Sequence, residues 1–182
     1  MKLFYILLGA TPQGRNVEQH DVFFGIAETI KELYPAIREF WKEAGQTYHM
    51  DGYQEVKYAD GYEVKIVPRE KNPLLKQLYF VNLGGYKKGY FEEFHQQSLL
   101  VGFSMAEIVK KAKASTFYKT MGFPKAVSHI DEKYGVDIDD VFAVDDILPL
   151  AMKEKYSIIL EPTDTKDQIN FSKVGYIKIN KK

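Results

Sequence analysis

Cysteine is absent from this 182-residue chain, and so is any net charge. The first absence excludes disulfide bonds, thiolate zinc sites and cysteine nucleophiles. The chain has 25 basic and 25 acidic residues, so its net charge is zero. The overall charge therefore gives no reason to expect binding to nucleic acid or to an acidic membrane surface. No apolar run approaches the roughly 18–20 residues that cross a bilayer. These absences predict a soluble, cytoplasmic protein without a nucleic-acid or membrane partner.

Common catalytic signatures are absent as well. The sequence has no serine nucleophile elbow, HExxH motif, dinucleotide fingerprint or kinase signature. Two Gly-x4-Gly segments, at 9–14 and 84–89, follow apolar runs but lack the Lys-Ser/Thr pair of a phosphate-binding loop. We interpret each as a turn between two strands, with an anion-binding backbone nest as the alternative. No cofactor is therefore expected.

The chain does contain an internal repeat. Residues 3–20 align without a gap on residues 78–95, and leucine, glycine, glutamate and histidine recur at the same places. Further on, residues 49–51 (His-Met-Asp) match residues 129–131 (His-Ile-Asp). All four histidines of the protein lie in these matched motifs. The repeat predicts a duplicated unit, with two similar halves about a pseudo-twofold axis.

Each half is predicted to be a ββαββ unit, which makes the fold class α+β. In the first half Pro35 should kink or divide the helix, and Asp60-Gly61 predicts a hairpin between the last two strands. In the second half the capping box Ser104-Met-Ala-Glu107 begins a helix that is expected to reach about Tyr118. The closing strands of the second half are predicted at 141–144 and 156–160.

The repeat also sets the predicted domain boundaries. The first repeat is assigned to residues 1–72 and the second to residues 73–160. A C-terminal extension, residues 161–182, has no counterpart in the first repeat. Its residues 174–179 predict one further strand, interpreted as an edge strand that ties the halves together.

Histidine and carboxylate residues two positions apart are the main candidates for a site. Residues two apart on a strand share a face, so each Glu-x-His or His-x-Asp pair presents an imidazole beside a carboxylate. Such groups suit ligand binding, a general base with an orienting carboxylate, or a divalent metal ion. The candidate ligand-binding residues are Glu18, His20, His49, Asp51, Glu93, His95, His129 and Asp131.

A structural role for these pairs is the favoured interpretation. Duplication copies structural residues as readily as functional ones, and Ser128-His-Ile-Asp131 is itself a capping box. A binding or catalytic site without metal ranks second. A metal site ranks last, so no metal is predicted, and its low-ranked candidate ligands are His20, His49, His95 and His129. No catalytic residue can be assigned from the pattern.

Three longer segments carry a family resemblance. LLGATPQGRNVEQHDVFFGIAE, FVNLGGYKKGYFEEFH and SHIDEKYGVDIDD resemble the bacterial domain-of-unknown-function family DUF1543, over most of the chain up to about residue 160. The resemblance implies a bacterial, cytoplasmic setting. It carries no established activity, so no residue role follows from it.

Three functional hypotheses follow from these observations. The leading one is a non-enzymatic binding or interaction protein that holds an unknown small molecule or protein, motivated by the duplicated surface and the missing catalytic signatures. The alternative is a hydrolase-like enzyme, divalent-metal dependent in one form, that uses the paired motifs. The third is an immunity- or adaptor-type protein that binds through exposed strand edges or aromatic residues. The sequence leaves the oligomeric state open, a homo-oligomer included.

Overall fold

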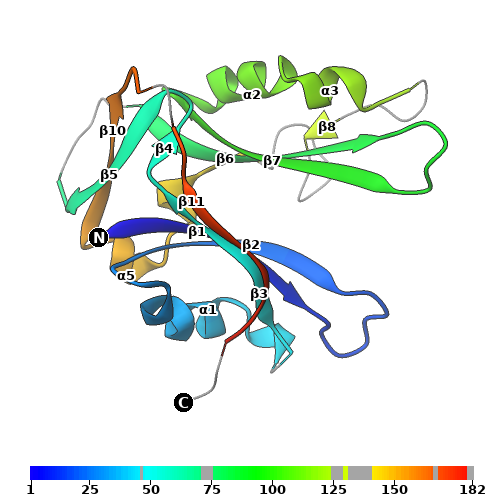
Figure 1. Cartoon of the computed structure of the whole chain (residues 1–182), viewed down its shortest axis with the longest axis horizontal. Helices are drawn as coiled ribbons and strands as arrows, with labels where there is room; N and C mark the ends of the chain where they lie inside the picture. The colour runs from blue at the N-terminus through cyan, green and yellow to red at the C-terminus, as the bar shows by residue number, and fades with distance from the viewer. Residues whose placement is uncertain (46, 71–75, 124–128, 131–140, 166–167, 180–182) are drawn as a thin grey trace. The chain divides into compact units, whose positions relative to one another are not determined.

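The computed structural model describes residues 1–45, 47–70, 76–123, 129–130, 141–165 and 168–179. These residues form two compact units: unit 1 comprises Met1–Lys71 and Ile147–Lys182, and unit 2 comprises Asn72–Asp146. Each unit combines antiparallel strands with short helices (Figure 1). The predicted α+β class is confirmed. No helix among the described residues is long and apolar enough to cross a membrane.

Sheet A, with strand order β11-β3-β1-β2, forms the larger sheet of unit 1. β1 and β2 make a hairpin in which Lys2 pairs with Ala27 at one end and Ala10 pairs with Gln19 at the other. The first Gly-x4-Gly segment therefore joins two antiparallel strands, as the turn interpretation predicted. The strands of this sheet are β1 (Lys2–Ala10), β2 (Gln19–Ala27), β3 (His49–Val56) and β11 (Phe171–Lys178).

Three short helices follow β2, namely η1 (Ile30–Leu33), α1 (Tyr34–Phe40) and η2 (Lys42–Ala44). Pro35 lies in the first turn of α1, where a missing N–H leaves no hydrogen bond unmade, so it divides the predicted helix. Ile26, four residues before η1, pairs with Leu3 and lies in β2.

The core of unit 1 lies between sheet A and these helices. Alternate residues of β1 enter it, because successive side chains of a strand point to opposite faces. Gly9 belongs to the other set and therefore lies on the face turned away from this core. The buried members of the core are Phe4, Ile6, Leu8, Phe23, Ala27, Leu33, Ile37 and Met50.

Sheet B, with strand order β10-β5-β4, completes unit 1. β4 (Tyr58–Ala59) and β5 (Tyr62–Pro68) form the predicted hairpin, whose turn residues Asp60 and Gly61 both have positive φ. β10 (Tyr156–Pro162) follows α5 (Leu150–Lys153) and pairs with β5 along its whole length.

The two C-terminal strands pair within unit 1. The strand predicted at 156–160 exists as β10, but it does not close the second repeat, because its hydrogen bonds go to β5 of unit 1. Residues 147–160 accordingly belong to unit 1. The strand predicted at 174–179 exists as β11, which pairs with β3 at the edge of sheet A.

Unit 2 is built on the hairpin of β6 and β7. β6 pairs with β7 on one side and with both β8 and β9 on the other. Two helices, α2 and α3, lie along this hairpin (Figure 1), and α2 contributes Ile108 and Ala112 to a buried core with Tyr79, Val81 and Leu83 of β6. The elements are β6 (Gln77–Tyr86), β7 (Glu93–Gly102), α2 (Met105–Lys113), α3 (Thr116–Thr120), β8 (His129–Ile130), β9 (Val141–Ala143) and α4 (Val144–Ile147).

The predicted helix of the second half is divided in two. Ser104 caps α2 as expected, because its side chain accepts a hydrogen bond of 3.3 Å from the backbone N–H of Glu107. The helix ends at Lys113, and Ser115 then caps α3 by accepting a 3.2 Å hydrogen bond from the N–H of Tyr118. A second serine cap thus interrupts a helix that was predicted to continue.

Candidate functional site

Two histidines meet at one glycine of sheet A. Gly9 in β1 pairs with His20 in β2 on one side and with His49 in β3 on the other. Directly paired residues of antiparallel strands project their side chains to the same face of the sheet. Both imidazoles therefore lie on the face of Gly9, opposite the core beneath α1.

A β-bulge adds an aspartate to the same place. Leu7 pairs with Gly52 and Leu8 with Met50, so Asp51 is an extra residue of β3 without a partner on β1. Bulges of this kind bend a strand and redirect a side chain. Here the carboxylate of Asp51 lies beside the imidazole of His49.

Glu18, His20, His49 and Asp51 form one cluster, hereafter the His–carboxylate cluster. The Nε2 atom of His20 lies 3.5 Å from Oε2 of Glu18 and 3.3 Å from Oδ2 of Asp51. The Nε2 atom of His49 lies 3.2 Å from Oε1 of Glu18 and 3.0 Å from Oδ1 of Asp51. Each imidazole thus contacts both carboxylates. The Glu-x-His and His-x-Asp motifs of the first repeat thus meet in unit 1.

The cluster is open to solvent on one side. The side chain of His49 is 7% exposed, that of Asp51 is 31% exposed, and that of Glu18 is 41% exposed. His20 is the outermost member, with 60% of its side chain exposed. A ligand from solvent would therefore meet His20 and Glu18 before it reached the other two.

The Nδ1 atom of His49 is buried and has no hydrogen-bond partner. With the imidazoles counted as neutral at pH 7, the carboxylates of Glu18 and Asp51 give the cluster a formal net negative charge.

One carboxylate oxygen of the cluster is left without a hydrogen bond. Oδ2 of Asp51 is buried and accepts no hydrogen bond of normal geometry, although Nε2 of His20 lies 3.3 Å away. A buried acceptor in this state costs free energy unless a donor or a cation approaches it. This atom is the least satisfied acceptor of the cluster.

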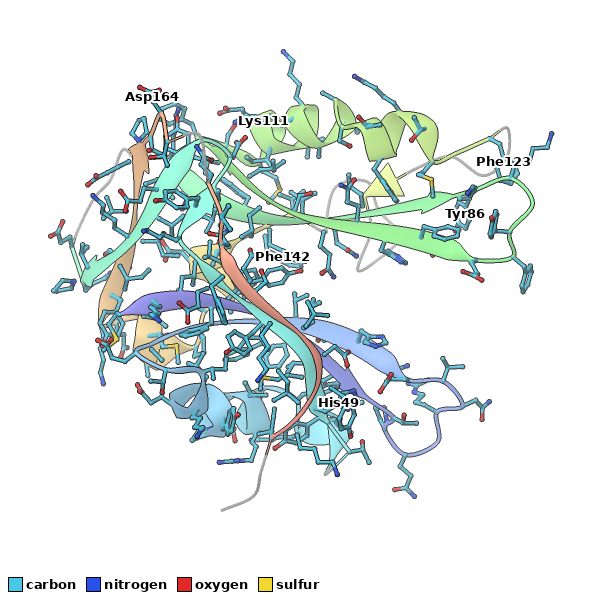
Figure 2. The ribbon with its side chains drawn as sticks, viewed as in Figure 1. His49, Tyr86, Lys111, Phe123, Phe142 and Asp164 are labelled. Atoms are coloured by element: carbon cyan, nitrogen blue, oxygen red, sulfur yellow. The ribbon has the colours of Figure 1, made fainter. Side chains whose placement is uncertain are left out.

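Two residues of the site were missed at the level of sequence. Tyr176 of β11 lies over His49, with 4.1 Å between the ring centroids and 33° between the planes, and Figure 2 shows His49 at the end of β3 beside β11. Gly9 supplies room, because a Cβ there would lie 2.8 Å from both Oδ2 of Asp51 and Nε2 of His49. Gly9 was visible in the repeat, whereas no sequence signal joins Tyr176 to His49.

The cluster does not have the arrangement of a preformed metal centre. No group of three or more histidine, aspartate or glutamate side chains among the described residues is placed to hold a metal ion. The four groups lie close together, but their present orientations make contacts with one another. A metal ion would require them to turn.

The candidate residues of the second motif set are placed only in part. Glu93 and His95 are exposed residues of β7, and His95 pairs with Gly84 of β6. His129 of β8 pairs with the same glycine. Asp131 lies outside the described residues.

Comparisons with known proteins agree on the family and the fold. Residues 15–66 match the model of a family described as Domain of Unknown Function (DUF1543), so the resemblance seen in the sequence is confirmed over this segment. The crystal structure of a protein Il1583 from Idiomarina loihiensis is similar over 99% of both chains, with a TM-score of 0.60 and 20% sequence identity. At that identity the likeness concerns the fold alone. No curated protein matches the chain.

Proposed function

We propose that this chain is a non-enzymatic binding protein that holds a positively charged group between the carboxylates of Glu18 and Asp51. The observation that carries the proposal is the His–carboxylate cluster itself. Its net negative charge attracts a cation, and its partial burial strengthens that attraction relative to open solvent. The buried Oδ2 of Asp51, which accepts no hydrogen bond, supplies a vacant acceptor.

We expect the side chain of His20 to be displaced when the ligand binds. It is the most exposed member of the cluster, and its contacts with Glu18 and Asp51, at 3.5 and 3.3 Å, are the longest of the four. A cationic group in its place can donate to Oε2 of Glu18 and to Oδ2 of Asp51 at once. His49 stays fixed beneath Tyr176 and forms the floor of the site.

An organic ammonium group and a divalent cation both carry the positive charge that the carboxylates of Glu18 and Asp51 would attract. The ammonium is the better fit to the observed orientations, because it donates hydrogen bonds to single oxygens and needs no ligand set around one point. A divalent cation would need both imidazoles to turn their Nε2 atoms toward it, with bond lengths of about 2.0–2.2 Å. Methylammonium chloride and zinc chloride are therefore the two probes.

The test is an NMR titration of the imidazole Hε1 protons, which is practicable because the protein has only four histidines. Addition of either probe should shift the Hε1 signals of His20 and His49 together, at one midpoint. Glu18→Gln and Asp51→Asn should each raise that midpoint at least about tenfold, since each removes one of two charge-assisted partners worth roughly 1.5–3 kcal/mol.

Asp164→Asn is the matched control, because Asp164 is an exposed carboxylate outside the cluster. It changes the charge of the chain as Asp51→Asn does and should leave the midpoint unchanged. Shifts that persist unaltered in both Glu18→Gln and Asp51→Asn would show that the probes bind elsewhere. Neither probe shifting His20 or His49 would overturn the proposal.

The two units are further proposed to be copies of one ancestral unit. Support comes from the pairing registers: Gly9 pairs with His20 and His49, and Gly84 pairs with His95 and His129. Alternate residues of β1 and of β6 enter the respective cores at equivalent positions of the repeat.

A further inference from the structure

We infer that unit 2 carries a second, independent site of the same class, built on Glu93 and His95 beside Gly84. The inference rests on the proposed function of unit 1 and extends it from one bound cation to two for each chain. The first support is the backbone pairing, because Gly9 in unit 1 and Gly84 in unit 2 each pair with two histidines. In unit 2 the flanking residues are His95 of β7 and His129 of β8.

The face on which these residues lie is also equivalent. In unit 1, Ile6 and Leu8 enter the core, and Gly9 faces the other side. In unit 2, Val81 and Leu83 enter the core that α2 covers, so Gly84 faces away from α2. His95 pairs directly with Gly84 and therefore shares its face.

A carboxylate accompanies the histidine in both units. Glu18 precedes His20 by two residues, and Glu93 precedes His95 by two residues on β7. Both Glu93 and His95 are exposed, so a ligand from solvent can reach them. The histidines thus occupy equivalent register positions in two separate sheets, and the glutamates occupy equivalent positions of the repeat at the start of β2 and β7.

The second site should be the more open of the two. In sheet A, β11 pairs with β3 and brings Tyr176 over His49. In unit 2, Glu93 and His95 are both exposed, whereas the side chain of His49 in unit 1 is only 7% exposed. An exposed site leaves its ligand in contact with water, which weakens electrostatic attraction. We therefore expect a higher midpoint for the second site.

The histidine Hε1 titration with methylammonium chloride and zinc chloride tests the inference on the intact chain. His20 and His49 should shift at one midpoint, and His95 should shift at a second, higher midpoint. Glu93→Gln should raise only the second midpoint, by at least about tenfold, and Glu18→Gln should raise only the first by a similar factor. These two substitutions are matched, because they remove the same group from equivalent positions.

Each outcome is decisive. If His20 and His49 shift while His95 does not, the second site is overturned and the proposed function of unit 1 stands. If no histidine shifts, the proposed function fails and the second site with it. If Glu18→Gln abolishes the shift of His95 as well, the residues form a single dependent site, which also overturns the inference. The amide spectrum of each variant verifies that its fold is retained.

Discussion

The ring of Tyr176 lies over the imidazole of His49, with ring centroids 4.1 Å apart, although the two residues are far apart in the chain. Tyr176 is itself 64% exposed, so the contact covers His49 without burying the tyrosine. An aromatic contact of this kind is worth roughly 0.5–1.5 kcal/mol. The strand β11 is thereby coupled to the His–carboxylate cluster.

Tyr176→Ala should lower the free energy of unfolding by about 1 kcal/mol, because it removes this contact and opens His49 to water. Tyr176→Phe keeps the ring and should stay within about 0.5 kcal/mol of the parent protein. Urea denaturation measures both, and the Hε1 shift of His49 reports the loss of the ring current. Equal stabilities for the two variants would mean that the stacked ring contributes nothing.

Gly9→Ala should destabilise the protein by about 1–3 kcal/mol, as overpacking of a well-filled site does. The added Cβ would lie 2.8 Å from Oδ2 of Asp51 and from Nε2 of His49, and His49 has little room to retreat. In an Asp51→Ala background one of these clashes is gone, so the same substitution should cost less. A double-mutant cycle in urea measures the difference, and strict additivity would contradict the proposed packing.

Gly61→Ala should destabilise the β4–β5 hairpin by about 1–2 kcal/mol, since Gly61 has φ +83 and an alanine is strained there. Asp60→Asn is the matched control, because asparagine also accepts the positive φ of +49 found at Asp60. Thermal or urea unfolding should therefore separate the two variants clearly. If both lose the same stability, the conformation of this turn is not the cause.

Tyr5 should ionise later than an ordinary tyrosine when the pH is raised. It stacks on Phe24, with 5.0 Å between ring centroids and 8° between planes, and burial raises the pKa of Tyr5 well above its usual value. A group whose pKa is raised in the folded state contributes stability that is complete below its unfolded pKa, about 10 for tyrosine, and is lost as the pH rises above it.

The comparison of Tyr5→Phe with the parent protein isolates this effect from the other tyrosines. The parent should lose more stability than Tyr5→Phe between about pH 10 and the onset of alkaline unfolding. Urea denaturation across this range measures the difference, and the phenolate absorbance of the parent should show a late-titrating group that Tyr5→Phe lacks. Parallel stability curves would mean that Tyr5 is as accessible in the folded state as in the unfolded chain.

The sequence predicted correctly those features that depend on residues close together in the chain. Pro35 divides the first helix, Ser104 caps α2, and Asp60-Gly61 forms the turn between β4 and β5. The candidate site followed from the repeat, because matched strands in matched registers bring His20 and His49 to one glycine. Each of these features depends on a few neighbouring residues or on a single strand register.

The long-range pairings could not be read in the same way. β10 contains a short apolar run, residues 158–160, as many strands do, and nothing in that run identifies β5 as its partner. The bulge at Asp51 appears only when β3 is aligned against β1, and the position of Tyr176 depends on a register shift between β11 and β3. These features depend on how strands that are distant in the sequence pair with one another, and a local sequence pattern does not determine that pairing.

The discontinuous make-up of unit 1 has a consequence for biosynthesis. Its sheets A and B need β10 and β11, and the ribosome makes these strands only after it has made all of unit 2. Since domains generally fold as units while the chain emerges, unit 2 can reach its native state first. Until β10 and β11 have been made, β3 and β5 each have one unpaired edge. An unpaired strand edge can pair with another chain, so the nascent protein is most prone to wrong pairing during this period. The part of the protein that is translated first is thus completed last.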